Sequence, residues 1–184
     1  MKSKVTIVSR FSILIITVAS LSFAALAMAQ TPGAHSSPTT SGTAAKATEG
    51  SSLSTKDKTF MRKAAKGGMM EVAMGRLAEQ NGQSEDVKSF GKRMVTDHGK
   101  ANDELKSIAA KKGVKLPGKE PSEKWSSDKT YMNMMVKDHE KDLAEFQEEA
   151  NNGSDPDVKK FAEKTAKVVQ EHLDLAKETH SKLQ

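Results

Sequence analysis

The chain of 184 residues has 29 basic and 24 acidic residues, no cysteine, and a formal net charge of +5. Three of the basic residues, Lys2, Lys4 and Arg10, lie at the start of the chain, and without them the charge falls to +2. That balance is too close to neutral to indicate nucleic-acid binding, and the absence of cysteine excludes a disulfide, a thiol nucleophile and a lipoprotein anchor.

Residues 1–29 have the pattern of a secretory signal peptide. A basic start precedes a mostly apolar stretch at 11–23, and Ala27 and Ala29 form a small-x-small cleavage site before Gln30. The alternative is an uncleaved anchor, because the apolar stretch approaches the ~20 residues that span a bilayer. Interspersed serines and threonine favour cleavage. We expect a chain exported to the periplasm or cell envelope, with no stable membrane span after cleavage.

Residues 30–54 are rich in Ser, Thr, Gly and Ala and are expected to form a flexible linker. Residues 55–184 have the length of one domain, and their apolar residues recur at alternating gaps of four and three. This spacing is typical of helices with coiled-coil-like packing in a bundle. It predicts an all-α domain with helices at about 56–81, 85–112, 128–151 and from 156 onward.

Local signals mark the ends of these helices. Ser84 is predicted to cap the second helix with its side chain, and Gly113 to follow its last turn. Asp155 is predicted to cap the fourth helix, with Pro156 at the first helical position, where proline is tolerated. The third helix is predicted to end at Gly153.

The two halves of the domain are related in sequence. Three blocks recur at a displacement of 71 positions: Asp57-Lys-Thr-Phe60-Met61 as Asp128-Lys-Thr-Tyr131-Met132, Asn81-Gly82 as Asn152-Gly153, and Asp86-Val87-Lys88 as Asp157-Val158-Lys159. Three separate blocks at one displacement indicate a duplicated helical hairpin. The predicted fold is therefore a four-helix bundle made of two related hairpins.

Each expected helix carries one titratable residue on its apolar stripe: Glu71, His98, His139 and His172. An acidic residue precedes each histidine, an arrangement that orients imidazoles in metal sites but is also common on amphipathic helices. The four residues are candidate ligands of a divalent metal ion. The alternatives are a buried polar network without metal, which the sequence favours, and a pH-responsive or catalytic role.

The path of residues 114–127 decides whether these four side chains meet. If this segment were a plain turn, the four residues would spread over roughly 9 Å along the bundle, at 1.5 Å per residue. If it crosses the whole bundle, the spread falls to roughly 4.5 Å. Fourteen extended residues reach about 46 Å, against about 40 Å for a 27-residue helix, so the crossing is feasible. We expect the long crossover.

The order of these motifs resembles that of a family called domain of unknown function 4142, over roughly residues 57–175. The residues that carry the resemblance are Glu71-Val72-x-Met74-Gly75-x-Leu77-Ala78, Val87-Lys88-x-Phe90, Asp97-His98, Tyr131-Met132, His139 and His172-Leu173. The resemblance implies a secreted or envelope bacterial protein with a ferritin-like bundle and a long crossover. It implies no activity, because none is established for the family.

The candidate ligands differ from those of di-iron ferritins, which use Glu-x-x-His on two helices. Val95 and Val169 stand three residues before His98 and His172, so a ferroxidase centre is not expected. Three histidines and one carboxylate suit Zn²⁺ or Cu²⁺ better than iron. Two methionines near His139 would suit Cu⁺, although core packing is the favoured interpretation of such a stripe.

Two functions remain open from the sequence. The leading hypothesis is a non-enzymatic periplasmic or envelope bundle that needs no cofactor and acts either through its surface, on an envelope protein partner, or as a stress-related accessory protein. The alternative is a metal-binding bundle of the Zn or Cu type with a redox role. The sequence does not fix the oligomeric state.

Mass spectrometry of the exported chain should identify Gln30 as the first residue, because the small-x-small site ends at Ala29. An intact N-terminus on membrane-bound protein would contradict cleavage and favour the anchor.

Overall fold

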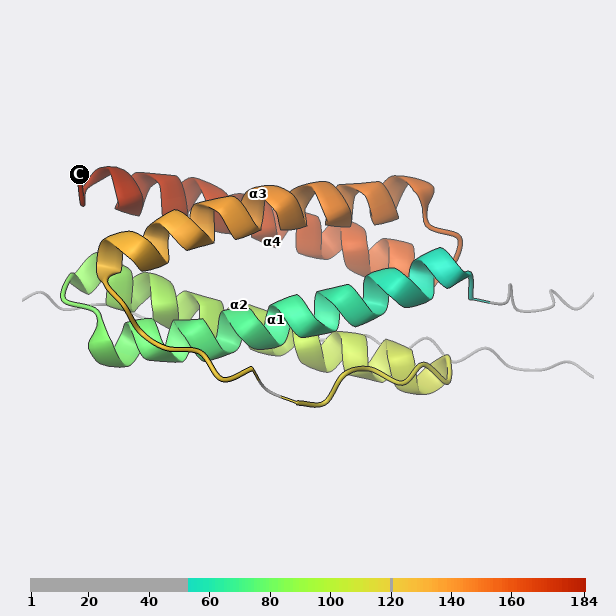
Figure 1. Ribbon diagram of the computed structural model, residues 1–184. Coiled ribbons are helices and arrows are strands. Elements are labelled where there is room, and N and C mark those ends of the chain that lie inside the picture. Colours follow the sequence, from blue (N-terminus) through green and yellow to red (C-terminus); the bar gives the residue numbers. More distant parts are fainter. Residues whose placement is uncertain (1–52, 120) are drawn as a thin grey trace, which may run out of the picture. The chain divides into compact units, whose positions relative to one another are not determined.

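Four long helices follow one another in the computed structural model, which describes residues 53–119 and 121–184 (Figure 1). They are α1 (Thr55–Asn81), α2 (Glu85–Lys111), α3 (Asp128–Asn152) and α4 (Pro156–Ser181). These bounds confirm the predicted helices to within a few residues. The expected signal peptide and nearly all of the expected linker lie outside the described residues. None of the four helices is both long and apolar enough to cross a lipid bilayer.

The helices form two hairpins, α1–α2 and α3–α4, which pack together through α1 against α3 and α2 against α4. Figure 1 shows α2 and α3 running in the same direction, with the segment between them passing along the length of the bundle. Val114 and Leu116 pack on the apolar cluster at one end, and Trp125 packs on the cluster at the other end. The predicted long crossover is therefore confirmed.

The helix ends follow the local sequence with one exception. The Asp155 side chain accepts from the N–H groups of Asp157 and Val158, as predicted for the cap of α4. Gly113 follows the last turn of α2, as predicted, with a φ of 65°. The Val114 N–H donates to the Ala109 carbonyl, which completes a Schellman motif.

The prediction for Ser84 is wrong, because its side chain makes no capping hydrogen bond. Its backbone N–H instead donates to Asp128 at the start of α3, at 2.7 Å. The start of α2 is thus held by a tertiary contact, and its first turn has no side-chain cap from Ser84.

The recurring aspartate of the two half-repeats has a reciprocal role. The Asp57 carboxylate on α1 accepts from the Ser154 N–H in the α3–α4 turn at 2.9 Å. The Asp128 carboxylate on α3 accepts from the Gln83 N–H in the α1–α2 turn at 3.1 Å. Asp128 follows Asp57 by 71 positions, and Ser154 follows Gln83 by the same 71 positions. The carboxylate of each hairpin therefore binds the turn of the other hairpin.

Two apolar clusters flank the middle of the bundle. The first is centred on Phe60, Phe146 and Phe161, whose rings meet at centroid distances of 5.1 to 6.5 Å. The second contains Phe90 and Tyr131, which meet edge to face at 6.0 Å. Along α2, α3 and α4 the histidines occupy the positions between these two clusters. The core is therefore apolar on both sides of a polar layer.

Close approach of α1 and α2 depends on glycine. A Cβ on Gly75 would lie 2.7 Å from the Gly91 carbonyl oxygen, and one on Gly91 would lie 2.6 Å from the Gly75 carbonyl oxygen. Both distances are too short for any side chain, so the two backbones touch at this point.

The Asp128→Ala substitution should destabilise the domain by about 1 kcal/mol, because it leaves the Gln83 and Ser84 N–H groups without their acceptor. Urea unfolding measures the change, with Lys129→Ala at the exposed neighbouring position as the matched control. Equal stability of the two variants would show that the contact between the hairpins contributes nothing.

Candidate metal centre

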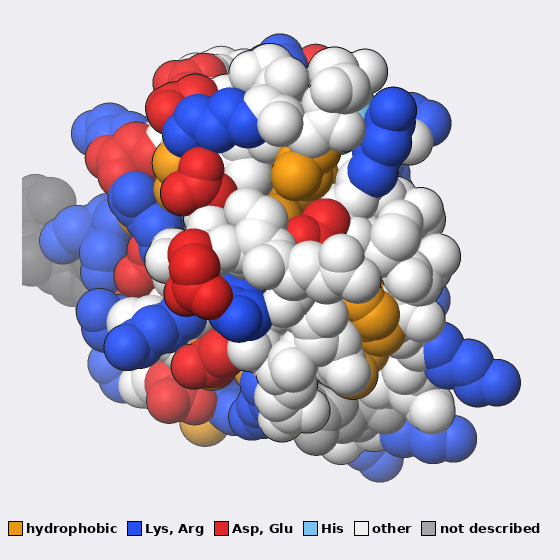
Figure 2. Space-filling view, turned by 90° about the vertical axis from the view of Figure 1, so that its left-hand side faces the viewer, with side chains coloured by type: hydrophobic (Ala, Val, Ile, Leu, Met, Phe, Trp, Pro, Cys, Tyr) orange, Lys and Arg blue, Asp and Glu red, His pale blue; other side chains and the backbone are white. Residues whose placement is uncertain are grey.

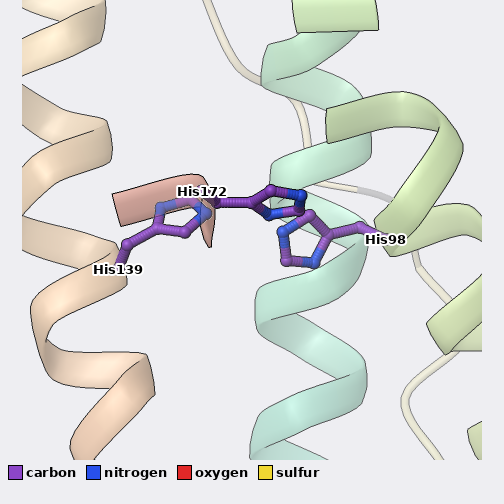
Figure 3. A group of neighbouring side chains, drawn as sticks. All are labelled: His98, His139 and His172. Atoms are coloured by element: carbon purple, nitrogen blue, oxygen red, sulfur yellow. The ribbon is translucent and has the colours of Figure 1, made fainter. Parts of the chain in front are cut away.

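Three histidines from three helices meet in the middle of the bundle. His98 of α2, His139 of α3 and His172 of α4 are 7%, 1% and 0% exposed. Their ring centroids lie 5.7 Å (His98–His139), 5.2 Å (His98–His172) and 5.5 Å (His139–His172) apart, a nearly equilateral triangle (Figure 3). One nitrogen of each ring lies within 4.8 Å of the corresponding nitrogens of the other two. The structure thus brings these three candidate ligands together.

Hydrogen bonds fix the orientation of two of the rings. His139 Nδ1 lies 2.8 Å from the Met135 carbonyl oxygen, which can only accept, so Nδ1 carries the proton. His172 Nε2 lies 3.1 Å from Asp97 Oδ2 and donates to that carboxylate. Neutral imidazole has one protonated nitrogen, so the lone pair lies on Nε2 of His139 and on Nδ1 of His172.

The remaining nitrogens form a potential donor set. His139 Nε2, His172 Nδ1 and His98 Nε2 are buried and have no hydrogen-bond partner among the described residues. Metal-bound histidines almost always donate their other N–H to a carboxylate or a backbone carbonyl, as His172 and His139 do here. The cluster therefore resembles a three-histidine site in which two of the three ligands already have their supporting hydrogen bonds.

The electrostatics keep these rings neutral. Burial lowers the pKa of His98 well below its usual range, and the neighbouring His172 and His139 lower it further. Burial, followed by the effect of His172, lowers the pKa of His139 to about 4. The pKa of His172 is also lowered by burial, although its bond to Asp97 opposes the shift. Neutral imidazole is the form that binds a metal ion.

The three acidic residues that precede the histidines have different partners. Asp97 precedes His98 in the sequence but holds His172 on the facing helix. Arg93 joins this carboxylate, at 3.3 Å, to Glu171, at 2.6 Å. Among the described residues, Asp97 is the one of these three acids that hydrogen-bonds an imidazole, and it does so across the interface between α2 and α4.

Glu71, the fourth predicted ligand, lies outside the group of converging histidine nitrogens. Its side chain is fully buried, and neither carboxylate oxygen has a hydrogen-bond partner among the described residues. Burial raises the pKa of Glu71 well above its usual range, and Asp142 and Asp138 of α3 raise it further. Glu71 is therefore held protonated beside α3, and metal binding by it stays a prediction.

Sequence reasoning missed Asp142, the acidic partner of Glu71 on α3. Burial, followed by the effects of Glu145 and Asp138, raises the pKa of Asp142 to about 6. The repeat contained the signal, because Asp142 follows Glu71 by the same displacement of 71 positions. The two carboxyl groups thus occupy equivalent positions in the two half-repeats.

Comparison with known proteins places this chain in a family. The family model described as Domain of unknown function (DUF4142) matches residues 42–179. The chain belongs to this family. Among curated proteins, no sequence matches this DUF4142 chain.

A solved structure supports the fold of the DUF4142 domain. It is a two-domain protein from Anabaena variabilis that contains DJ-1/ThiJ/PfpI-like and ferritin-like domains. The match has a TM-score of 0.56 at 13% identity, and it covers 71% of this chain and 38% of that one. Such low identity shows the fold alone, and it confirms the ferritin-like bundle predicted from the sequence.

Metal-free protein should lose the stability contributed by His139 as the pH falls from about 6.5 towards 4. The unfolded chain binds the proton near pH 6.5, whereas the folded ring has a pKa of about 4, so protons favour unfolding in this window. Urea unfolding between pH 4 and 7 in the presence of a chelator should show a loss on the order of 2 kcal/mol that His139→Gln removes.

The control is His180→Gln, which changes a histidine outside the cluster. Asp142 and Glu149, with pKa values raised to about 6 and about 7, act in the opposite sense in wild type and variants alike. The contribution of His139 is therefore the difference between the wild-type and His139→Gln curves of unfolding free energy against pH. Parallel curves for wild type and His139→Gln would show that the ring is not buried in its neutral form.

Proposed function

We propose that this chain is an exported metal-binding protein that holds one Zn²⁺ or Cu²⁺ ion through His98, His139 and His172. The observation that carries the proposal is the convergence of three buried, unpartnered imidazole nitrogens within 4.8 Å of one another. Three imidazoles with a fourth position left open are the ligands of several zinc centres.

The donor set favours Zn²⁺ or Cu²⁺ over iron. Iron sites in ferritin-like bundles use carboxylates together with Glu-x-x-His pairs. Here the converging ligand atoms are three nitrogens, and imidazole suits Zn²⁺ and Cu²⁺, which stand at the tight-binding end of the divalent series. The nearby Glu71 is held protonated by burial, so it offers no carboxylate charge to the centre.

A polar network without metal is the competing explanation, and the unpartnered atoms argue against it. A completed network would give each buried ring nitrogen a donor or an acceptor, and each one left unpaired costs about 1–3 kcal/mol. Three such nitrogens face one another at the histidine cluster. A bound cation would satisfy all three at once. Hydrogen bonds place the lone pairs on His139 Nε2 and His172 Nδ1, and His98 can adopt the tautomer that presents a lone pair on Nε2.

The proposed export rests on the signal pattern of residues 1–29, with its basic start, apolar stretch and cleavage site. The surface at one end of the bundle agrees with a role that does not involve nucleic acid. Figure 2 shows the end of the bundle that carries the α1–α2 turn, where basic and acidic side chains are interspersed. Interspersed charges do not provide the basic stripe that tracks a phosphate backbone.

Isothermal titration with Zn²⁺ and Cu²⁺ should give one equivalent bound to the wild-type protein. His98→Ala, His139→Ala and His172→Ala should each abolish stoichiometric binding, whereas His180→Ala should leave it unchanged. Asp97→Asn should weaken binding by about 10–100-fold, because it removes the carboxylate that orients His172.

Thermal unfolding supplies a second readout. Metal at 100 times its Kd should stabilise the wild-type protein by about 2.7 kcal/mol. Circular dichroism identifies any variant that has lost its fold. Folded wild-type protein that binds neither metal stoichiometrically, or a His180→Ala variant that loses binding as the cluster variants do, would refute the proposal.

A further inference from the structure

A groove between α2 and α4 reaches the histidine cluster from outside the bundle. It has a volume of about 340 Å³, and both His98 and His172 line it. Small and medium side chains, Ala101, Thr165 and Val168, also line it. The groove therefore ends against two of the three histidine side chains, whose ligand nitrogens lie buried behind it.

Two ion pairs across this interface bound the groove. Arg93 of α2 binds Glu171 of α4 at 2.6 Å, and Lys164 of α4 binds Glu104 of α2 at 2.6 Å. All four side chains line the groove, and each is more than a third exposed. Exposed pairs of this kind contribute about 0–1 kcal/mol, so they mark the mouth of the groove without sealing it.

We propose that this groove admits a small anion, such as a carboxylate, to the open coordination position of the histidine centre. This inference rests on the proposed metal binding and extends it from the ion to the ligand that the ion receives. Three protein ligands leave a tetrahedral ion one free position. The side chains of two of the three ligands, His98 and His172, line the groove.

The charge of the entering ligand follows from the charges around the centre. An imidazole that coordinates a metal ion through its lone pair is a neutral ligand, so three of them leave the charge of a divalent ion uncompensated. The groove lining does not compensate it, because its three cations, Arg93, Lys100 and Lys164, are balanced by three acidic residues, Asp97, Glu104 and Glu171. A bound ion is then the largest net charge in the site, and it favours an anion over a neutral ligand of the same size.

The test uses Cu²⁺-loaded protein with azide as the probe and visible absorption as the readout. Azide should produce a saturable new absorption band in the wild-type protein. Acetate should displace azide, whereas acetamide, which has the same size and no charge, should not do so at the same concentration.

Two variants fill the groove from opposite walls, Ala101→Phe on α2 and Val168→Phe on α4. Each should bind Cu²⁺ as the wild type does, because no ligand is changed, and each should weaken azide binding at least tenfold. Ala110→Phe, at an exposed position of α2 outside the groove, is the matched control and should bind azide normally. Two variants guard against the loss of one through misfolding.

The outcomes separate the two proposals. Wild-type protein that binds no Cu²⁺ would refute the proposed function and this inference with it. Stoichiometric Cu²⁺ without an azide band would refute the inference alone. Normal azide binding in a folded groove-filling variant would refute the groove as the path, and equal displacement of azide by acetate and acetamide would refute the preference for an anion.

Discussion

The reach of the chain between α2 and α3 is the constraint on which the rest of this structure depends. Fourteen extended residues span about 46 Å, just enough to pass a helix of about 40 Å, so the segment can return the chain to the end where α2 began. Because α3 then runs parallel to α2, His98, His139 and His172 come to one level of the bundle. A short turn would have left them several ångströms apart along its axis.

The polar layer that results is costly, and the rest of the core offsets the cost. Burial disfavours the charged form of each group. It lowers the pKa of an imidazole such as His98, which stays neutral, and raises the pKa of Glu71, which stays protonated. Aromatic and methionine-rich clusters on both sides supply the apolar burial that stabilises the domain. The reciprocal contacts of Asp57 and Asp128 then hold the two hairpins together at the turns. The layer can therefore retain unpartnered nitrogens within a stable bundle.

Sequence reasoning predicted the features that periodicity and chain length control. The four helices, the crossover and the common level of the histidines follow from apolar spacing and a rise of 1.5 Å per residue. The lateral direction of a side chain depends instead on helix rotation and rotamer. Apolar spacing therefore places Glu71 on the core stripe without fixing whether its carboxylate reaches the histidine nitrogens. For the same reason, the pairing of Asp97 with His172 could not be read from its position beside His98. The repeat at Asp57 and Asp128 was visible, but its contact with the opposite turn required the fold.

The central claim is that the three imidazoles bind one metal ion together, and X-ray absorption at the zinc edge of Zn²⁺-loaded protein tests it most directly. The structure predicts a first coordination shell with three imidazole nitrogens at about 2.0–2.1 Å and one further light atom. A shell made mainly of carboxylate and water oxygens, with at most one imidazole, would place the ion on the acidic surface and contradict the account.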